Sequence, residues 1–139
     1  MQRLNPADSM RVDNVSARRN LLTGQIIGCA LDVHRELGPG LFEKAYERAL
    51  CVALSARRVQ FLRQVPCPVS YRGQIVGTSR CDLLVENLVV VEVKSIERLE
   101  RLHVAQVLTY LRATGTSLGL IINFKVTKLR DGIKRVIRS

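Results

Sequence analysis

The chain has 139 residues, of which 47% are hydrophobic, and it carries a formal net charge of +10. This length suits one compact domain and excludes two-domain enzymes and large barrels, while the hydrophobic fraction excludes a mostly disordered chain. No apolar run approaches the roughly 18 residues of a membrane span, and the N-terminus lacks the order of a signal peptide, so we expect a cytoplasmic protein without membrane contact.

The first half of the chain predicts a basic arm followed by two helices. Residues 1–18 mix polar and charged types without a period, which predicts a flexible arm before a single domain over residues 19–139. From Leu21 to Leu37 the apolar residues recur at spacings of three and four, as on one face of a helix. Gly38-Pro39-Gly40 ends this helix, and a second helix is predicted near residues 41–56.

Strand patterns follow from about residue 59. Pro66 and Pro68 interrupt the first strand, which therefore lies at a sheet edge. The residues around Gly73 predict a hairpin turn, and Glu86-Asn87 predicts a second one. The run Leu88–Lys94 is the most β-prone of the chain, and its apolar residues on both faces predict a central, covered strand.

The rest of the chain predicts a third helix over residues 98–114, a buried strand over 118–124, and a basic final segment with a short strand. The order of helices and strands indicates an α/β fold with a mixed sheet. No two of the four cysteines are close enough for a zinc-finger or CxxC site, so we expect small buried hydrophobic side chains at Cys29, Cys51, Cys67 and Cys81.

The charge balance points to a polyanionic partner. The chain has 22 Lys and Arg against 12 Asp and Glu, and such an excess attracts nucleic acids. Aromatic residues make up only 4% and Trp is absent, which disfavours a base-stacking surface and favours contact with backbone phosphates.

Two charged residues end the predicted central strand. Side chains alternate along a strand, so Glu92 and Lys94 share one face. Burying such charges costs several kcal/mol each unless they find partners or a cation. The Glu86-Asn87 turn places Asp82 near Val91, one neighbour from Glu92, and a shift of one residue would bring both carboxylates to one cation. The alternative is a salt bridge at the margin of the sheet.

Two carboxylates and a lysine are the groups that a magnesium-dependent phosphodiesterase needs. Carboxylate oxygens hold Mg²⁺ or Mn²⁺. The cation lowers the pKa of a bound water, and a lysine positions that water or stabilises the transition state.

Asp82 followed by Glu92-Val93-Lys94 resembles the D-x(n)-E-x-K signature of the PD-(D/E)XK nuclease superfamily. The run from Gly40 to Tyr46 is similar to the pattern of its GxxExxY family, and Gln106 to Tyr110 fits the QxxxY motif of its exonuclease-like branches. The resemblance covers about residues 22–137. It implies a restriction-endonuclease-like αβββαβ core with an extra N-terminal helix, and a nuclease that uses Mg²⁺ or Mn²⁺.

The resemblance also implies roles for individual residues. Asp82, Glu92 and Glu43 would bind the metal, and Lys94 would act on the attacking water; the supporting residues would be Gln106, Tyr110 and Tyr46. Glu43, Tyr46 and Glu47 share one helix face, for which the alternative is a solvated surface. Glu47 is assigned to that surface. For Gln106 and Tyr110 the alternative is a pair of polar groups that anchor the helix to the sheet.

Two other functions stay open. The chain could be a nucleic-acid-binding module with this fold and little or no turnover, or a basic subunit that contacts an acidic protein. We expect DNA rather than RNA as the partner, and a domain this small could form a homodimer to build a cleft.

Overall fold

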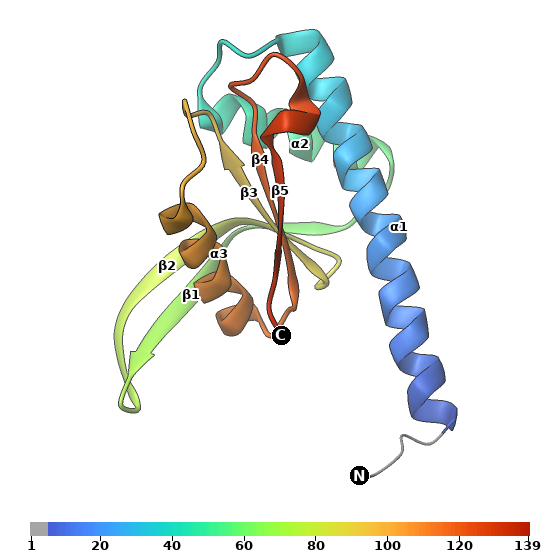
Figure 1. Cartoon of the computed structure of the whole chain (residues 1–139), viewed down its shortest axis with the longest axis vertical. Coiled ribbons are helices and arrows are strands. Elements are labelled where there is room, and N and C mark those ends of the chain that lie inside the picture. Colours follow the sequence, from blue (N-terminus) through green and yellow to red (C-terminus); the bar gives the residue numbers. More distant parts are fainter. Residues whose placement is uncertain (1–5) are drawn as a thin grey trace.

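The computed structural model describes residues 6–139, with side chains described from residue 14 onward. Five strands form one mixed sheet in the order β1-β2-β3-β4-β5, with helices on both faces (Figure 1). The elements are α1 (Pro6–Leu37), α2 (Glu43–Ala56), β1 (Phe61–Tyr71), β2 (Gln74–Val85), β3 (Val89–Lys94), α3 (Arg101–Thr114), β4 (Leu118–Asn123), the 3-10 helix η1 (Leu129–Gly132) and β5 (Ile133–Ile137).

This arrangement confirms the predicted α/β fold with an αβββαβ core and one additional N-terminal helix. β1, β2 and β3 are antiparallel neighbours, and β3 pairs with β4 in parallel through the crossover helix α3. β1 lies at the sheet edge, as Pro66 and Pro68 predict. The expected flexible arm differs from the structure: residues 6–18 belong to α1, and residues 1–5 lie outside the described residues.

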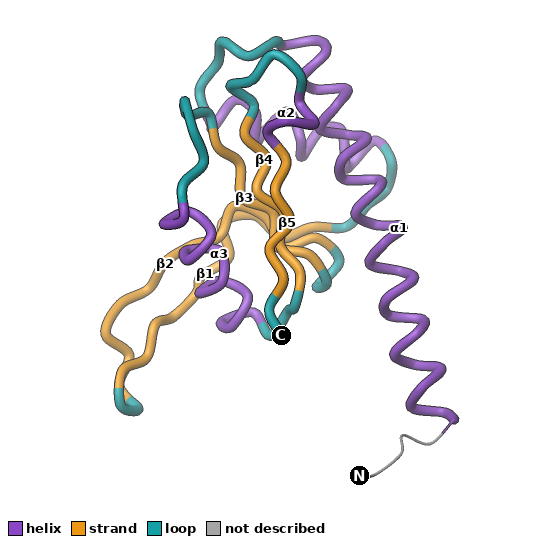
Figure 2. The backbone as a smooth tube through the Cα atoms, in the orientation of Figure 1, coloured by secondary structure: helices purple, strands orange, loops and turns teal. Residues whose placement is uncertain are grey.

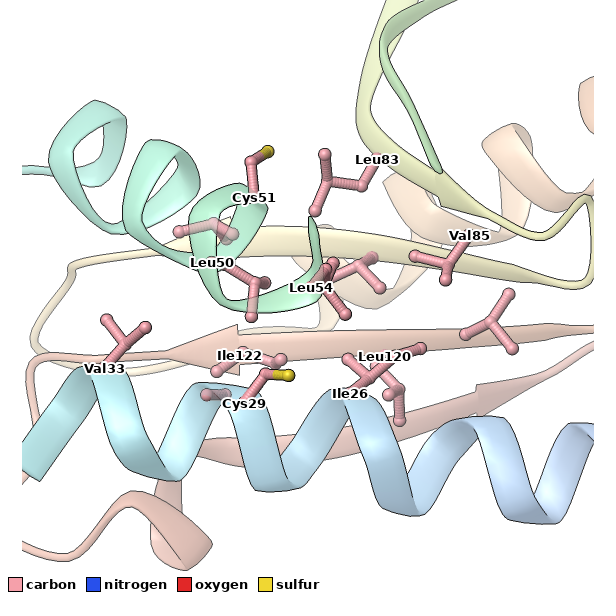
Figure 3. Close-up of a cluster of buried hydrophobic side chains, with 14 of the residues drawn as sticks. Ile26, Cys29, Val33, Leu50, Cys51, Leu54, Leu83, Val85, Leu120 and Ile122 are labelled. Atoms are coloured by element: carbon pink, nitrogen blue, oxygen red, sulfur yellow. The ribbon is translucent and has the colours of Figure 1, made fainter. Parts of the chain in front are cut away.

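The core has two parts, one on each side of the sheet. α1 and α2 cover one face, where Ile26, Leu50 and Leu54 pack against Leu120 and Ile122 (Figure 3). α3 covers the other face. β3 and β4 are buried along almost their whole length, which is why their sequences are nearly continuous in Val, Leu and Ile. All four cysteines are buried and unpaired, as predicted.

The hairpin of β1 and β2 changes face part-way along its length. Residues two apart in a strand normally point to the same face, yet Cys81 packs under α3 while Leu83 packs under α1 and α2. Gln64 marks the change, because its φ of 49° lies in the left-handed region and it interrupts the ladder opposite Asp82. From this bend the hairpin extends past α3 (Figure 1).

The close packing where η1 meets β4 gives a direct test of the fold. A Cβ added at Gly132 would lie 2.1 Å from the backbone oxygen of Asn123, so Gly132→Ala must displace the backbone. We expect urea denaturation to show a loss of roughly 2 kcal/mol in the free energy of unfolding. The matched control is Gly77→Ala, where a Cβ has no atom within 4 Å; it should change stability by less than about 0.5 kcal/mol.

Candidate active site

The ladder between β2 and β3 ends at the point where two acidic residues face each other. The last paired residues are Leu83 and Val91, one residue away from the register predicted from the turn, so Asp82 lies opposite Glu92. Beyond that pair, side chains replace backbone pairing. The Asp82 amide donates to Glu92 Oε1 at 3.0 Å, and the Val93 amide donates to Asp82 Oδ2 at 2.8 Å. Each carboxylate therefore holds the backbone of the opposite strand.

Lys94 completes this end of β3. Its Nζ lies 3.5 Å from Glu92 Oε2, and its side chain is 18% exposed, so the ammonium borders the carboxylates and still reaches solvent. Asn123 of β4 pairs with Lys94 of β3 and holds the segment that follows β3. Its Nδ2 donates to the Ile96 carbonyl, and its Oδ1 accepts from the Ile96 amide. Figure 2 shows that the loops after α1, β3 and β4 gather at this same end of the sheet.

A third carboxylate reaches the cluster from α2. Glu47 is only 5% exposed, and its Oε1 accepts a 2.6 Å hydrogen bond from Gln64 Nε2, which also lies 3.3 Å from Asp82 Oδ1. Arg63 approaches Glu47 Oε2 at 3.7 Å. The assignment of Glu47 to the surface is therefore wrong. A sequence signal existed, because Glu47 shares the spacing of the buried residues Leu50, Cys51 and Leu54 on the inner face of α2.

The electrostatics of the cluster favour a cation. Burial, together with the neighbouring Asp82 carboxylate, raises the pKa of Glu92 to about 8. Burial and the nearby Glu47 also raise the pKa of Asp82, although the Val93 amide and Gln64 oppose that shift. Two carboxylates that face each other in a partly desolvated site titrate as a pair and retain a proton near neutral pH. A bound divalent cation would replace this proton and neutralise the negative charge of the two carboxylates.

A family model described as the PD-(D/E)XK nuclease superfamily matches residues 20–136, from within α1 into β5. The chain belongs to the PD-(D/E)XK nuclease superfamily. Members of this superfamily typically use a divalent metal. Searches of curated proteins and of solved structures give no significant match. Among residues 6–139, none of the helices combines the length and apolarity needed to cross a membrane.

The donor atoms of the site suit the hard cations that this superfamily uses. In the described part of the chain, no three or more His, Cys, Asp and Glu side chains form a ready-made metal cage. Mg²⁺ needs less than that, because it is usually held by one or two carboxylates, with waters and substrate phosphates completing an octahedron. Asp82 and Glu92 provide those two carboxylates, and both present oxygen only. The residues present therefore fit a magnesium or manganese ion.

Two residues singled out on α2, Glu43 and Tyr46, form no hydrogen bond or ion pair with Asp82 or Glu92 among the residues that the structure describes. Glu43 is exposed at the first position of the helix, one turn before Glu47. The Tyr46 hydroxyl does not hold a carboxylate, because it donates to the Gly38 carbonyl and accepts from the Leu41 amide at 3.0 Å. Its ring stacks on Phe124, with 4.4 Å between centroids.

Tyr46 still supports the site indirectly. It holds the loop between α1 and α2, and the Leu41 carbonyl of that loop accepts a 2.7 Å hydrogen bond from Ser95 Oγ, next to Lys94. Tyr46, the last residue of the GxxExxY pattern, therefore holds the loop that contains Leu41, and Ser95 joins this loop to the segment after β3.

The two residues of the QxxxY motif on α3 also differ in burial. Tyr110 is buried, and this burial together with the charges of Glu92 and Asp82 raises the pKa of its hydroxyl to about 12. Gln106 lies one turn earlier and is exposed. Tyr110 therefore lies in the core on the α3 side of the sheet, close enough to feel the charges of the carboxylate pair, whereas the Gln106 side chain is exposed to solvent.

Proposed function

We propose that this protein is a metal-dependent nuclease of the GxxExxY family that hydrolyses phosphodiester bonds, with DNA as its substrate. The observation that carries the proposal is the meeting of Asp82, Glu92 and Lys94 at one end of the central strands, with Glu92 Oε2 3.5 Å from Lys94 Nζ. Membership of the PD-(D/E)XK superfamily supports the same chemistry.

The position of each side chain in the site indicates its role in the reaction. The carboxylate oxygens of Asp82 and Glu92 would hold Mg²⁺ or Mn²⁺. The Gln64 amide contacts both Glu47 and Asp82, so the Glu47 carboxylate of α2 would add negative charge close to the metal. When bound, the metal supplies positive charge to the phosphoryl oxygens and lowers the pKa of a bound water. Lys94, beside the carboxylates and open to solvent, would hold the attacking water or stabilise the charge that develops on the phosphate.

The surroundings support a nucleic-acid substrate. The net charge of +10 raises the local concentration of a polyanion and speeds its encounter with the protein. The carboxylate cluster would repel phosphates without a cation, so substrate binding at the site itself should depend on the metal. Basic residues elsewhere would bind the backbone by releasing its counterions, with a strong dependence on salt.

A cleavage assay with matched variants tests the proposal. Labelled single- and double-stranded DNA and RNA are incubated with Mg²⁺, Mn²⁺ or EDTA. We expect the wild type to cut DNA with metal and not in EDTA, and Glu92→Gln to lose at least about 100-fold in rate because it removes a ligand charge without changing side-chain size. Equal rates in the wild type and the variant, or cleavage in EDTA, would overturn the mechanism. Binding to DNA without cleavage under any metal would instead support a non-catalytic binding module.

A further inference from the structure

We propose that residues 65–81, the part of the β1–β2 hairpin beyond the bend at Gln64 and Asp82, form an arm that binds double-stranded DNA beside the active site. This inference rests on the proposed function and names the form of its substrate. We refer to residues 65–81 as the hairpin arm.

The position of the hairpin arm fits a substrate contact. Asp82 and Gln64 of the site lie at the base of the arm, and the two strands extend from there past α3 (Figure 1). Its outer end is left uncovered: Tyr71, Ile75 and Val76 are 61%, 68% and 63% exposed. Exposing three large apolar side chains on one projecting turn is costly unless another molecule covers them.

The charge of the hairpin arm selects the kind of partner. Between Glu47 and Asp82 the sequence contains no Asp or Glu, whereas the arm carries Arg72 at its tip and Arg80 near its base. The Arg72 guanidinium lies 5.2 Å from the centre of the Tyr71 ring, which holds the charge at the end of the arm. A two-stranded ribbon with two arginines and no carboxylates complements a polyanion such as a phosphate backbone.

The edge of the hairpin arm argues against a second protein strand. β1 is an edge strand, and Pro66 and Pro68 remove two of the N–H donors that a partner strand would use. A register shift between Val69 and Ser70 further disturbs the edge. A second copy of this chain would also bring the same positive charge to the tip. Sheet extension and arm-to-arm dimers are therefore disfavoured.

The shape of the arm favours duplex over single strand. The major groove of B-DNA admits a two-stranded β-ribbon, and phosphates border it on both sides. A single strand needs successive aromatic platforms, and Tyr71 is the one aromatic residue of the arm. Asp82 is eight positions after Gln74 in the sequence. At about 3.3 Å per residue this stretch reaches at most about 27 Å, the length of about eight base pairs.

Binding in EDTA tests the arm separately from any metal-dependent chemistry. The probes are a fluorescein-labelled 24-base-pair duplex and a 24-nucleotide single strand, followed by anisotropy. The double variant Tyr71→Ser/Arg72→Gln should bind the duplex at least about fivefold more weakly than wild type and show a smaller salt slope, by about one. The control is Arg35→Gln on α1, which also removes one exposed arginine and should change affinity less than about twofold.

Each outcome decides one question. Loss of duplex affinity in the arm variant alone supports the arm, whether or not the protein cleaves DNA. Equal affinity of wild type and arm variant, tighter binding of the single strand by wild type, or no binding of wild type to either probe overturns it. Because no metal is present, these results leave the nuclease proposal to the cleavage assay. Both changed residues are exposed, and circular dichroism checks that the variant remains folded.

Discussion

Replacing Lys94 by Gln should lower the rate of metal-dependent DNA cleavage by about 10²- to 10⁴-fold, while the affinity for Mn²⁺ changes by less than about threefold. The reason is the position of Lys94 Nζ beside the carboxylate pair and not between its members: it lies 3.5 Å from Glu92 Oε2. A group that positions a nucleophile or stabilises transition-state charge contributes rate without being a ligand. Single-turnover cleavage gives the rate, and titration calorimetry gives the metal affinity.

Two comparison variants make this result specific. Lys125→Gln removes another lysine that pairs with a glutamate, since Lys125 Nζ lies 2.6 Å from Glu97 Oε1 at the surface, and it should leave both quantities unchanged within about twofold. Asp82→Asn should lose both metal affinity and cleavage, whereas Lys94→Gln should lose cleavage alone. A Lys94→Gln protein that cuts DNA at the wild-type rate would exclude Lys94 from the chemistry.

The sequence predicts best those helices and strands that are buried either on one face or on both faces, because their apolar residues then follow a clear pattern. The short, valine-rich apolar run from Leu88 to Val93 predicts a strand covered on both faces, and β3 has that position. Glu86 and Asn87 both adopt positive φ, the geometry of a tight hairpin turn, and this turn fixes β2 beside β3. These two features bring Asp82 close to Glu92 and Lys94, but the exact register depends on the loop, which has three residues, 86–88, instead of the predicted two and so shifts the pairing by one residue.

The parts that the sequence does not predict depend on contacts between distant elements. Gln64 occupies a left-handed conformation in the middle of a strand, which no local preference indicates. This bend lets one amide contact Glu47 from α2 and Asp82 from β2. Periodicity places Glu47 on the inner face of α2, but only the tertiary structure gives a buried carboxylate a partner there. Tyr46 is similar, because its hydroxyl binds loop backbone that the motif itself cannot position.

The stability of the metal-free protein should fall as pH rises from about 5.5 to 9, and Glu92→Gln should remove most of that fall. The pKa of Glu92 is about 8 in the folded protein, above its ordinary value of 4.5. Between those values the unfolded chain has released the proton that the folded chain retains, so the unfolded state binds fewer protons and stability decreases with pH. The slope is about 1.4 kcal/mol per pH unit while only the folded state retains the proton.

Urea denaturation of wild type and Glu92→Gln at pH 5.5 and pH 9, in EDTA, measures this difference. The titratable groups near Glu92 are Asp82, Lys94, Tyr110 and Cys81, and all four are present in both proteins. Asp82 titrates together with Glu92, so the comparison reports the pH dependence of the carboxylate pair. Glu97→Gln is the control, because Glu97 is exposed and Lys125 holds the pKa of its carboxyl below the ordinary value, outside the pH range tested. We expect the stability of Glu92→Gln relative to wild type to rise by roughly 3 kcal/mol between pH 5.5 and pH 9. Parallel pH profiles for the two proteins would mean that Glu92 is already ionised in the folded state, and that the carboxylate pair holds no proton for a metal to displace.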